Sequence, residues 1–544
     1  MLRRRFIQLI ASGILFGLLG ARARGNFDFD RYAFHHGVAS GDPLVDGVIL
    51  WTRISGGSGE TVSVVWQVSG DPDMRSVLAA GRVETDANRD YTVKVDVRGL
   101  PAGSRLYYRF TVENVHSPTG TTRTLPAGSI DTARFAVVSC SNFPAGYFHA
   151  YREIARRDDL DAVIHLGDYI YEYGLGGYAT QRAEEFGRVP DPTTELLTLD
   201  DYRRRHAQYK ADPDSQAMHA AHAMIAVWDD HEIANDGWKR GAENHDEDED
   251  SDEGRWSRRR DAAMQAYFEW LPIRGKARGR RTRIFREFSY GNLLNLLVLD
   301  TRYYGRDRQP DISGTDGSRE SIEAVLHGDK RHMLGRRQER WLRKKLDAAD
   351  TTWQVIAQQV LVSPLNSPDL EPVLDPEQPA LMAQKDVERN IAISKTNPPI
   401  LLDTWDGYPW ARQRLLRVIE HHATNAVILS GDLHTAIAGN LVPDGGVQPV
   451  TVEFMTGSVT SPGFAEYLPE RRPGALRDAT LQQNPNLRYM ETERRGWLCM
   501  TLTHAECSGE WHVLDTVADI AYKSSVDRRL AVAAGQIAAG LYDI

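Results

Sequence analysis

Cysteine is scarce in this sequence, which has three cysteines among 544 residues. Three cysteines cannot build a disulfide scaffold, so the fold must depend on apolar cores, and a chain of this length is expected to contain more than one. Cys499 and Cys507 are close enough in sequence to pair in an exported protein. Cys140 is then left over, as either a small buried apolar residue or a thiolate that reacts or binds a metal.

Positive charge is not in excess either, because 65 Lys and Arg face 75 Asp and Glu, a net charge of -10. A nucleic-acid-binding protein usually shows the opposite balance, so no nucleic-acid partner is expected other than as a substrate. An anionic substrate would need local positive charge from metal ions or a few arginines. The sequence also lacks a Gly-x-Ser-x-Gly elbow, which argues against a serine-nucleophile hydrolase.

No long apolar run follows the first twenty residues, so no membrane span is expected in the processed chain. Arg3-Arg4-Arg5-Phe6 is a basic patch with a twin-arginine pattern, Leu9–Gly20 is apolar but short, and Ala21-Arg22-Ala23 offers a cleavage site. These features predict a twin-arginine signal peptide over residues 1–24, and export by the twin-arginine machinery to the periplasm or the extracellular space. The alternative is an uncleaved N-terminal anchor.

Residues 29–126 have the pattern of short β-strands separated by Gly and Pro. Val93, Val95 and Val97 alternate with polar residues, which is the period of a half-buried strand. Several such runs in succession predict an N-terminal β-sandwich of the immunoglobulin or fibronectin type. Leu125-Pro126-Ala127-Gly128 is the expected domain boundary.

From residue 130 the pattern changes to alternating strands and helices, which predicts an α/β region over residues 130–515 with a mainly parallel sheet. Helices are expected at Tyr147–Arg157 and Leu334–Ala349, among others. The expected strands are Arg134–Ser139, Ala162–Leu166, Ala223–Trp228, Leu294–Leu299, Trp353–Val360 and Ala426–Leu429. In the C-terminal segment 516–544, the Ala-rich stretch Asp527–Leu541 predicts a helix that docks onto the rest of the chain.

A polar or charged side chain follows each of the six expected strands. One such residue could simply cap the next helix. Six together predict that these side chains converge on one edge of the sheet, where α/β proteins bind their ligands. In chain order they are Cys140-Ser141-Asn142, Gly167-Asp168, Asp229-Asp230-His231-Glu232 with Asn235 beyond it, Asp300-Thr301-Arg302, Gln358-Gln359 and Gly431-Asp432-Leu433-His434.

The side chains at this edge form the inventory of a two-metal hydrolytic site. Asp168 is suited to bridge two cations. Cys140 and Tyr171 would bind as thiolate and phenolate, which indicates ferric iron, whereas carboxylate and amide oxygens favour calcium, magnesium or manganese. This mixture of ligands argues against a plain structural zinc site, which prefers Cys and His.

Several motifs together resemble those of one family. Cys140-Ser141-Asn142, Gly167–Tyr173, Trp228–Glu232 and Gly431–Thr435 are similar to the motif set of the PhoD-like alkaline phosphatases, which belong to the calcineurin-like metallophosphoesterase superfamily. Phe34–Pro43 resembles the start of that family's N-terminal β domain. The resemblance spans nearly the whole chain. It implies an α/β (α+β) fold, with an immunoglobulin- or fibronectin-like β-sandwich followed by a four-layer α/β/β/α metallophosphatase domain.

The resemblance also implies roles for single residues. Asp168 would bridge the metals, and Cys140 and Tyr171 would bind iron. His231 would contact the phosphate or protonate the leaving group. Apart from the resemblance, the planar guanidinium of Arg302 suits either charge stabilisation on the phosphate or a contact with a carboxylate. The full set of implied metal ligands is Cys140, Asn142, Asp168, Tyr171, Asp230, Asn235, Asp432 and His434.

This ligand set departs from the usual pattern of the superfamily, because Cys, Asn or Asp stands where several histidines are usual. The departure favours the iron-plus-calcium cofactor associated with PhoD-like enzymes, with manganese, magnesium or zinc as alternatives. Asn235 could instead cap the following turn. The superfamily's fourth-motif histidine has no identified counterpart, although Gln358 and Gln359 lie about where it would be.

The reaction that the resemblance implies is hydrolysis of phosphate monoesters or diesters by metal-activated hydroxide, in a secreted alkaline phosphatase. A phospholipase D-like or cell-wall-polymer phosphodiesterase of the same family is an alternative. A surface-binding protein with structural metals is a further alternative, which turnover of any phosphoester would exclude. Sensitivity to chelators would separate all of these from a metal-free serine hydrolase.

Overall fold

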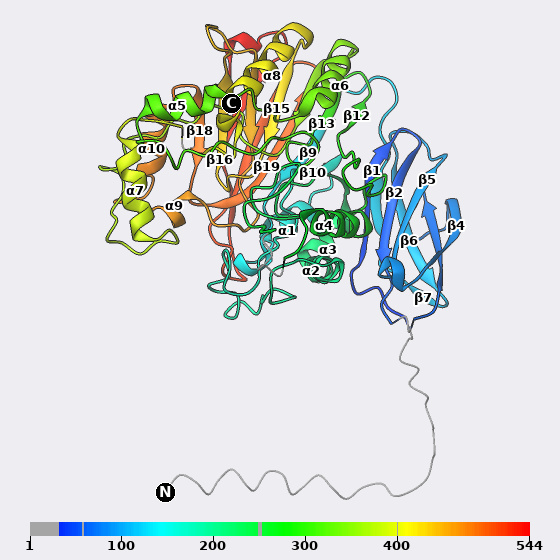
Figure 1. Ribbon diagram of the computed structural model, residues 1–544. Helices are drawn as coiled ribbons and strands as arrows, with labels where there is room; N and C mark the ends of the chain where they lie inside the picture. Colours follow the sequence, from blue (N-terminus) through cyan, green and yellow to red (C-terminus); the bar gives the residue numbers. More distant parts are fainter. Residues whose placement is uncertain (1–31, 57–58, 248–252, 400) are drawn as a thin grey trace, which may run out of the picture.

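The computed structural model describes residues 32–56, 59–247, 253–399 and 401–544 (Figure 1). The predicted signal peptide, residues 1–24, lies outside them. Within the described residues the strands form three sheets, of ten, seven and five strands. None of the helices in these residues is both long and apolar enough to cross a membrane.

The ten-stranded sheet is parallel at its centre, where β10 pairs with β9 on one side and β11 on the other. Because these three strands are parallel, their carboxyl ends lie at the same edge of the sheet. In spatial order the strands are β22 (Tyr542–Asp543), β21 (Ser524–Ala533), β20 (Glu506–Leu514), β19 (Arg495–Thr503), β9 (Thr132–Val138), β10 (Ala162–His165), β11 (Ala223–Ala226), β1 (Val38–Leu44), β2 (Gly47–Arg53) and β5 (Thr92–Arg98).

The seven-stranded sheet is parallel from β13 through β14 and β15 to β17. Its outer strands β12, β16 and β18 pair antiparallel with their neighbours. In spatial order the strands are β12 (Arg286–Tyr290), β13 (Leu294–Val298), β14 (Trp353–Ala357), β15 (Ala426–Ser430), β17 (Thr451–Met455), β16 (Ala436–Leu441) and β18 (Leu487–Glu491).

The ten- and seven-stranded sheets share one apolar core. Phe135 and Ile164 of the first sheet belong to the same buried cluster as Leu296, Val355 and Val427 of the second. The six expected strands are therefore all present, but they are divided between two sheets, three in each. The strand pattern alone predicts a single sheet, whereas the four-layer arrangement implied by the resemblance contains two. Hydrophobic patterns locate strands but do not identify their partners, which explains the error.

Helices cover the outer faces of these two sheets. Leu297 and Ile356, whose side chains alternate with those of the shared core, pack against Leu342 of α6 (Gly335–Asp347) and Leu415 of α8 (Pro409–His422). The predicted helices Tyr147–Arg157 and Leu334–Ala349 correspond to α1 and α6. Along the ten-stranded sheet lie α1 (His149–Ala155), α2 (Leu199–Ala211), α3 (Pro213–Ala221) and α4 (Trp256–Trp270).

Four further helices lie to one side of the sheets, at the left of Figure 1. They are α5 (Arg319–Gly328), α7 (Gln384–Ser394), α9 (Phe464–Tyr467) and α10 (Ala475–Gln483). Apolar residues of α7, α9 and α10 form a cluster separate from the shared core. Short 3-10 turns complete the described elements: η1 (Ala87–Arg89), η2 (Phe143–Ala145), η3 (Trp405–Gly407) and η4 (Ile537–Ala539).

The N-terminal strands pack around a core of their own. Val48 and Leu50 of β2 belong to one buried cluster together with Val64 of β3 and Phe110 of β6. Two sheets therefore contribute to this core, namely the β1-β2-β5 edge of the ten-stranded sheet and the five-stranded sheet. The latter contains β4 (Val77–Thr85), β3 (Val62–Ser69), β6 (Arg105–Val112) and β7 (Val115–His116), with β8 (Gly120–Arg123) paired to β6.

Backbone pairing joins the N-terminal strands to the α/β region. Strand β1 pairs in parallel with β11 at Ser40 and Gly41. A Cβ atom at position 41 would lie 2.5 Å from the carbonyl oxygens of both Met224 and Pro272, so only glycine fits this crossing. The two regions therefore share a continuous sheet across the sequence boundary expected near residue 126.

The prediction of a C-terminal helix at Asp527–Leu541 is wrong. Strand β21 occupies Ser524–Ala533 and pairs antiparallel with β20 along its length, and it is followed by the 3-10 turn η4. Leu530, Ala531 and Val532 are buried against the sheet. Pairing and burial override the weak helical preference that alanine gives to an isolated segment.

The cysteines are all free and buried. Cys499 on β19 lies opposite Glu510, whereas Cys507 on β20 lies opposite Leu502. Three residues of offset along neighbouring strands separate the two Cα atoms by about 10 Å, which is too far for a disulfide. The pairing considered from the sequence is therefore not formed.

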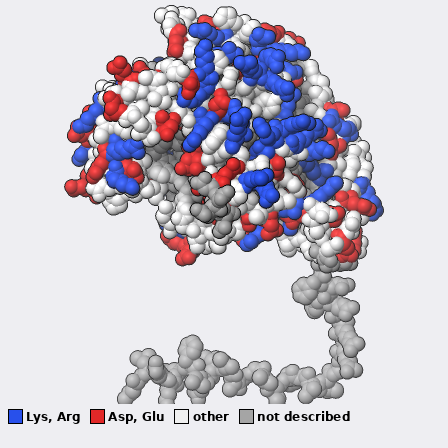
Figure 2. Space-filling view, viewed as in Figure 1, with Lys and Arg blue, Asp and Glu red and all other residues white. Residues whose placement is uncertain are grey.

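Positive charge gathers on one face of the molecule despite the net charge of -10. Figure 2 shows Lys and Arg over much of the face that carries α6 and α8. Arg336, Arg340 and Arg343 of α6 are exposed and line a groove with Trp410 and other residues of α8. The overall negative charge therefore does not extend to this face.

Candidate metal centre

The polar residues that follow the strands of both sheets meet at one rim. Cys140 follows β9, Asp168 follows β10 and Asp230 follows β11, each within four residues of the strand's end and all in the ten-stranded sheet. Asp432 and His434 come after β15 of the seven-stranded sheet. The carboxyl ends of the parallel strands of both sheets thus point to the same place, as the sequence predicted for one sheet.

Four of these residues have left-handed backbone conformations. The φ angles are +60° at Cys140, +54° at Asp168, +73° at Asp432 and +58° at His434. For non-glycine residues such a conformation costs about 1–3 kcal/mol and is concentrated at functional sites. Gly167 has a φ of +113°, and a Cβ there would lie 2.4 Å from the backbone nitrogen of Asp229, so this turn requires glycine.

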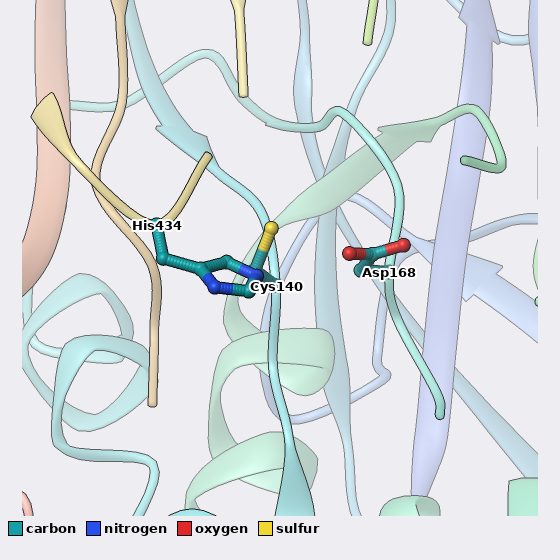
Figure 3. A group of neighbouring side chains, drawn as sticks. All are labelled: Cys140, Asp168 and His434. Atoms are coloured by element: carbon teal, nitrogen blue, oxygen red, sulfur yellow. The ribbon is translucent and has the colours of Figure 1, made fainter. Parts of the chain in front are cut away.

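Cys140, Asp168 and His434 form one group of potential metal ligands (Figure 3). The ligand atoms of the three residues lie within 4.8 Å of one another. Burial raises the pKa of the Cys140 thiol, and the nearby charge of Asp168 raises it further. A cation bound between these side chains would reverse this effect and favour the thiolate.

Asp168 also belongs to a second group, with Asp230 and His231. Asp230 in turn forms groups with Asp229 and Asp432, and the carboxylates therefore make a continuous row along the rim. Burial, together with the charges of the neighbouring carboxylates, holds the pKa of Asp168 well above its usual value. Its Oδ1 atom has no hydrogen-bond partner among the described residues, which leaves it available to a cation.

Tyr171 lies at the centre of the first group. Its hydroxyl donates to Oδ2 of Asp168 at 3.0 Å and accepts a hydrogen bond from Ser461 at 2.7 Å. The same oxygen lies 3.2 Å from Nε2 of His434. The predicted ligands Cys140, Asp168, Tyr171 and His434 are therefore neighbours in the structure.

Hydrogen bonding fixes which nitrogen of His434 could bind a metal. Nδ1 lies 3.0 Å from the carbonyl oxygen of Pro462 and must donate to it, because a carbonyl only accepts. Nε2 is then left with its lone pair toward Tyr171. Burial lowers the pKa of His434 to about 3, so the ring is neutral as a ligand requires.

His231 is held by a carboxylate that the sequence reasoning did not assign. Its Nδ1 lies 2.8 Å from Oε2 of the fully buried Glu172. Burial lowers the pKa of His231, but the negative charges of Glu172, Asp230 and Asp168 outweigh it and hold the pKa well above its ordinary value. His231 is thus held by Glu172 through Nδ1 and lies beside Asp230.

Arg302 faces carboxylates. The fully buried guanidinium pairs with Asp229 and Asp403, lies 3.0 Å from Asp432, and is absent from the lining of the cavity described below. The structure therefore favours the alternative noted from the sequence, in which Arg302 holds carboxylates, over direct contact with phosphate. Arg306 pairs with Asp403 as well.

Two of the predicted ligands are asparagines, which would bind a cation through their amide oxygens. Asn142 is buried just before η2, and neither side-chain atom has a hydrogen-bond partner among the described residues. Asn235 lines the cavity, and its amide nitrogen donates to Glu243 at 3.2 Å. The amide oxygen of Asn142 is thus without a donor among the described residues, and Asn235 presents its amide to the cavity.

Several further residues support the rim. The carboxylate of Glu232 accepts the backbone N–H groups of Asp168 at 3.0 Å and Asp229 at 2.8 Å, so it joins the loops after β10 and β11. Asp236 and Asp403 form a group with Asp230. Glu232 lies within a motif noted in the sequence, whereas Asp403 follows no strand and carried no signal.

Gln358 and Gln359 do not contribute ligands. Gln359 accepts from the backbone nitrogen of Thr301 at 2.9 Å and donates to the carbonyl of Leu299, which ties β13 to β14. Gln358 accepts from the indole of Trp405 at 3.1 Å. The hydrogen bonds of both side chains are therefore made to neighbouring segments of the protein. Neither side chain takes the place of the histidine of the superfamily's fourth motif.

A cavity of about 360 Å³ opens onto the rim. Asp168, Asp230, His231, Asp432 and His434 all line it. Its size is within the range of small-molecule sites, about 300–1,000 Å³. The candidate ligands and His231 therefore lie where a small ligand could reach them.

The sequence matches the family described as PhoD-like phosphatase over residues 135–511, and the N-terminal domain of that family over residues 20–126. Alkaline phosphatase D of Bacillus subtilis (strain 168) is 34% identical over 541 residues, which cover 95% of this chain and 85% of that protein. A solved structure described as "Structure of PhoD" matches with a TM-score of 0.80 at 32% identity, covering 95% of this chain and 93% of that one. These matches confirm the resemblance that the motifs indicated and the mixed α/β fold. The chain belongs to the PhoD-like phosphatases, a family of phosphoric ester hydrolases.

Proposed function

We propose that this chain hydrolyses phosphate monoesters and diesters in the cavity above Asp168, with two metal ions as cofactors. One observation carries the proposal. Asp168 belongs both to the group with Cys140 and His434 and to the group with Asp230 and His231. Two adjacent groups of donors that share a carboxylate are what a pair of cations requires, and such a pair suits a phosphoryl group.

The donors fit the two ions expected from the sequence. The first group offers sulfur, phenol and imidazole, which suits ferric iron, held by Cys140, Asp168, Tyr171 and His434. The second offers oxygen atoms, which suits calcium, held by Asp168, Asp230 and Asp432 with the amide oxygens of Asn142 and Asn235. Manganese, magnesium or zinc are the alternatives. When bound, the ions supply charge that polarises phosphoryl oxygens and lowers the pKa of water.

The remaining steps belong to side chains of the chain itself. Glu172 holds Nδ1 of His231, so Nε2 is the atom that carries a proton to the departing ester oxygen. Arg302 contributes by keeping Asp229 and Asp432 in place. The apolar surroundings of the cavity strengthen these electrostatic interactions because they limit access of water.

The proposal extends to export and domain architecture. Residues 1–24 act as a twin-arginine signal peptide, and the processed protein works in the periplasm or outside the cell. The N-terminal strands form an immunoglobulin- or fibronectin-like sandwich over residues 29–126, and residues 130–515 form a four-layer α/β/β/α domain. The shared cores of neighbouring sheets and the helices packed outside them support this arrangement.

Elemental analysis of the purified protein, combined with a panel of phosphate monoesters and diesters, tests the proposal. Stoichiometric metal and turnover that chelators abolish are expected. Asp168→Ala should lose both, whereas Asp131→Ala, an exposed carboxylate on the N-terminal side of β9, should lose neither. A metal-loaded protein that hydrolyses no ester would refute the function, and a fully active Asp168→Ala variant would refute the bridge.

A further inference from the structure

The cavity has two chemically different halves. Every Asp and His that lines it belongs to the groups of potential metal ligands: Asp168, Asp230, His231, Asp236, Asp403, Asp432 and His434. The other half is mainly apolar and carries no charge. Its apolar lining residues are Leu365, Pro368, Leu370, Met382, Leu401, Leu433, Pro462, Phe464, Leu468, Leu476 and Met490, and the uncharged polar residues Asn235, Asn366, Ser367, Asn390, Thr480, Tyr173, Tyr178 and Tyr467 complete the lining. No Lys or Arg is among the described residues that line the cavity.

The apolar half comes mainly from segments outside the two packed sheets. Leu370 and Leu476 belong to a cluster with residues of α7 and α10, and Leu365 and Met490 belong to an adjacent cluster. Phe464 at the start of α9 contacts both clusters. Helices α7, α9 and α10 lie together beside the sheets in Figure 1, so this group of helices supplies one wall of the cavity.

Some of these apolar side chains are only partly buried by the protein itself. Leu370 and Leu476 are buried in their cluster, whereas Leu401, Leu433 and Phe464 are half-buried. When a ligand covers half-buried apolar side chains that face a cavity, the burial of their surface favours binding of that ligand. Phosphate is a poor ligand for these particular side chains, because hydrocarbon offers it neither a cation nor an N–H donor. The apolar wall therefore suits the organic part of an ester.

The absence of cations restricts this organic part further. A second phosphate, a carboxylate or another anionic group placed against the wall would lose its hydration without a Lys or Arg to replace it. It would also lie near the carboxylates of the rim. An uncharged chain or ring avoids both costs.

We propose that the wall formed by Leu401, Phe464 and their apolar neighbours is a subsite for an uncharged alkyl or aryl group attached to the ester oxygen. The proposal rests on the proposed function and adds a substrate class to it. The phosphoryl group lies at the rim and the alkyl or aryl group lies along the wall. Each methylene that reaches the wall should raise kcat/KM about fourfold. This factor corresponds to the free energy of transferring one methylene group from water to an apolar site.

A series of n-alkyl phosphates tests this subsite with the metal-loaded protein. Methyl, butyl and hexyl phosphate have similar leaving groups, so their kcat/KM values differ mainly through the alkyl chain. We expect kcat/KM to rise at least tenfold from methyl to hexyl phosphate. Hexane-1,6-bisphosphate, which adds an anionic group at the far end of the same chain, should fall back toward methyl phosphate. Equal kcat/KM values along the series would overturn the subsite.

Variants of the wall locate the effect. Leu401→Ser and Phe464→Ser should reduce the hexyl-to-methyl ratio of kcat/KM several-fold, and Phe464→Leu should restore most of it. Leu78→Ser changes a leucine that is 51% exposed on β4, in the N-terminal sheet, and should leave the ratio unchanged. A ratio that survives both Ser substitutions would contradict the proposal.

Binding of n-alkylphosphonates separates this proposal from the proposed function. Methyl- and hexylphosphonate are not hydrolysed, and calorimetry measures their affinity for the metal-loaded protein directly. Tighter binding of hexylphosphonate without turnover of any phosphate ester would refute the function while supporting the subsite. Equal affinities together with turnover of methyl phosphate would support the function and overturn the subsite.

Discussion

Glu172 accepts a hydrogen bond from Nδ1 of His231 across 2.8 Å, and the two residues are 59 positions apart in the sequence. The other carboxylate oxygen of Glu172 accepts from the backbone nitrogen of Asn235 at 2.7 Å and from the side chain of Asn244 at 2.8 Å. Three donors thus fix the fully buried carboxylate. Glu172 and Asn244 do not line the cavity, so the carboxylate holds Nδ1 of His231 from outside it.

Glu172→Gln should reduce kcat by about 10- to 100-fold while the metal content stays unchanged, because an amide holds the imidazole and its proton less well. The loss should be larger for alkyl phosphates than for 4-nitrophenyl phosphate, whose leaving group needs no proton. Glu243→Gln, an exposed residue on the far side of Asn235, is the matched control and should keep both rates. Equal losses on both substrates would assign Glu172 a purely structural role.

Two buried cysteines allow a matched test of the thiolate. Cys140→Ala should lose iron and at least about 100-fold in activity, because the thiol lies within 4.8 Å of the ligand atoms of Asp168 and His434. Cys507→Ala, on β20 and also free, should keep its iron. Elemental analysis of both variants is the measurement. Iron retained in full by Cys140→Ala would contradict a thiolate ligand.

The residues predicted from the sequence are those whose position follows from a strand and the turn after it. Cys140, Asp168 and Asp230 each lie within four residues of the end of a buried strand, so a local pattern places them at a sheet edge. Glu172 and Asp403 could not be found in this way. Glu172 is recognised only by its contact with His231, and Asp403 follows no strand but reaches the rim through Arg302 and Arg306.

The errors in the fold have the same origin. Short apolar runs located the strands β9, β10, β11, β13, β14 and β15 but could not assign them to two sheets, because pairing depends on partners far away in the sequence. Alanine at the C-terminus was interpreted as helical, yet Leu530 and Val532 are buried in β21 against β20. Tertiary pairing decided both cases.

Arg302→Met should destabilise the protein without a selective rise in KM. The guanidinium is fully buried and pairs with Asp229, Asp403 and Asp432, so its removal leaves several buried carboxylates without their cation. Breaking such a buried network costs about 3–5 kcal/mol. Chemical unfolding of the metal-loaded protein measures this cost, and Arg336→Met on the exposed face of α6 is the control. Unchanged stability with a raised KM would instead place Arg302 on the phosphate.

His206 offers a test of stability that is independent of the metal centre. It is fully buried in α2, stacks 6.5 Å from Trp270, and neither ring nitrogen has a hydrogen-bond partner among the described residues. Burial, with smaller effects of Lys210 and Arg205, lowers the pKa of His206 to about 3. The folded state therefore keeps the ring neutral where the unfolded chain, with a pKa near 6.5, takes up a proton.

The sign of the pH dependence follows from this difference. Above about pH 6.5 neither state binds the proton, and the full stability is present. As the pH falls from 6.5 toward 3, the unfolded chain is protonated first, so His206 removes up to about 1.4 kcal/mol of unfolding free energy for each pH unit. His206→Phe should remove this part of the slope, and it should raise stability at pH 8 by about 1–3 kcal/mol because two unpaired nitrogens are no longer buried. Urea unfolding at pH 8, 6 and 5 measures both effects, and an unchanged slope would show that the imidazole is paired or hydrated in solution.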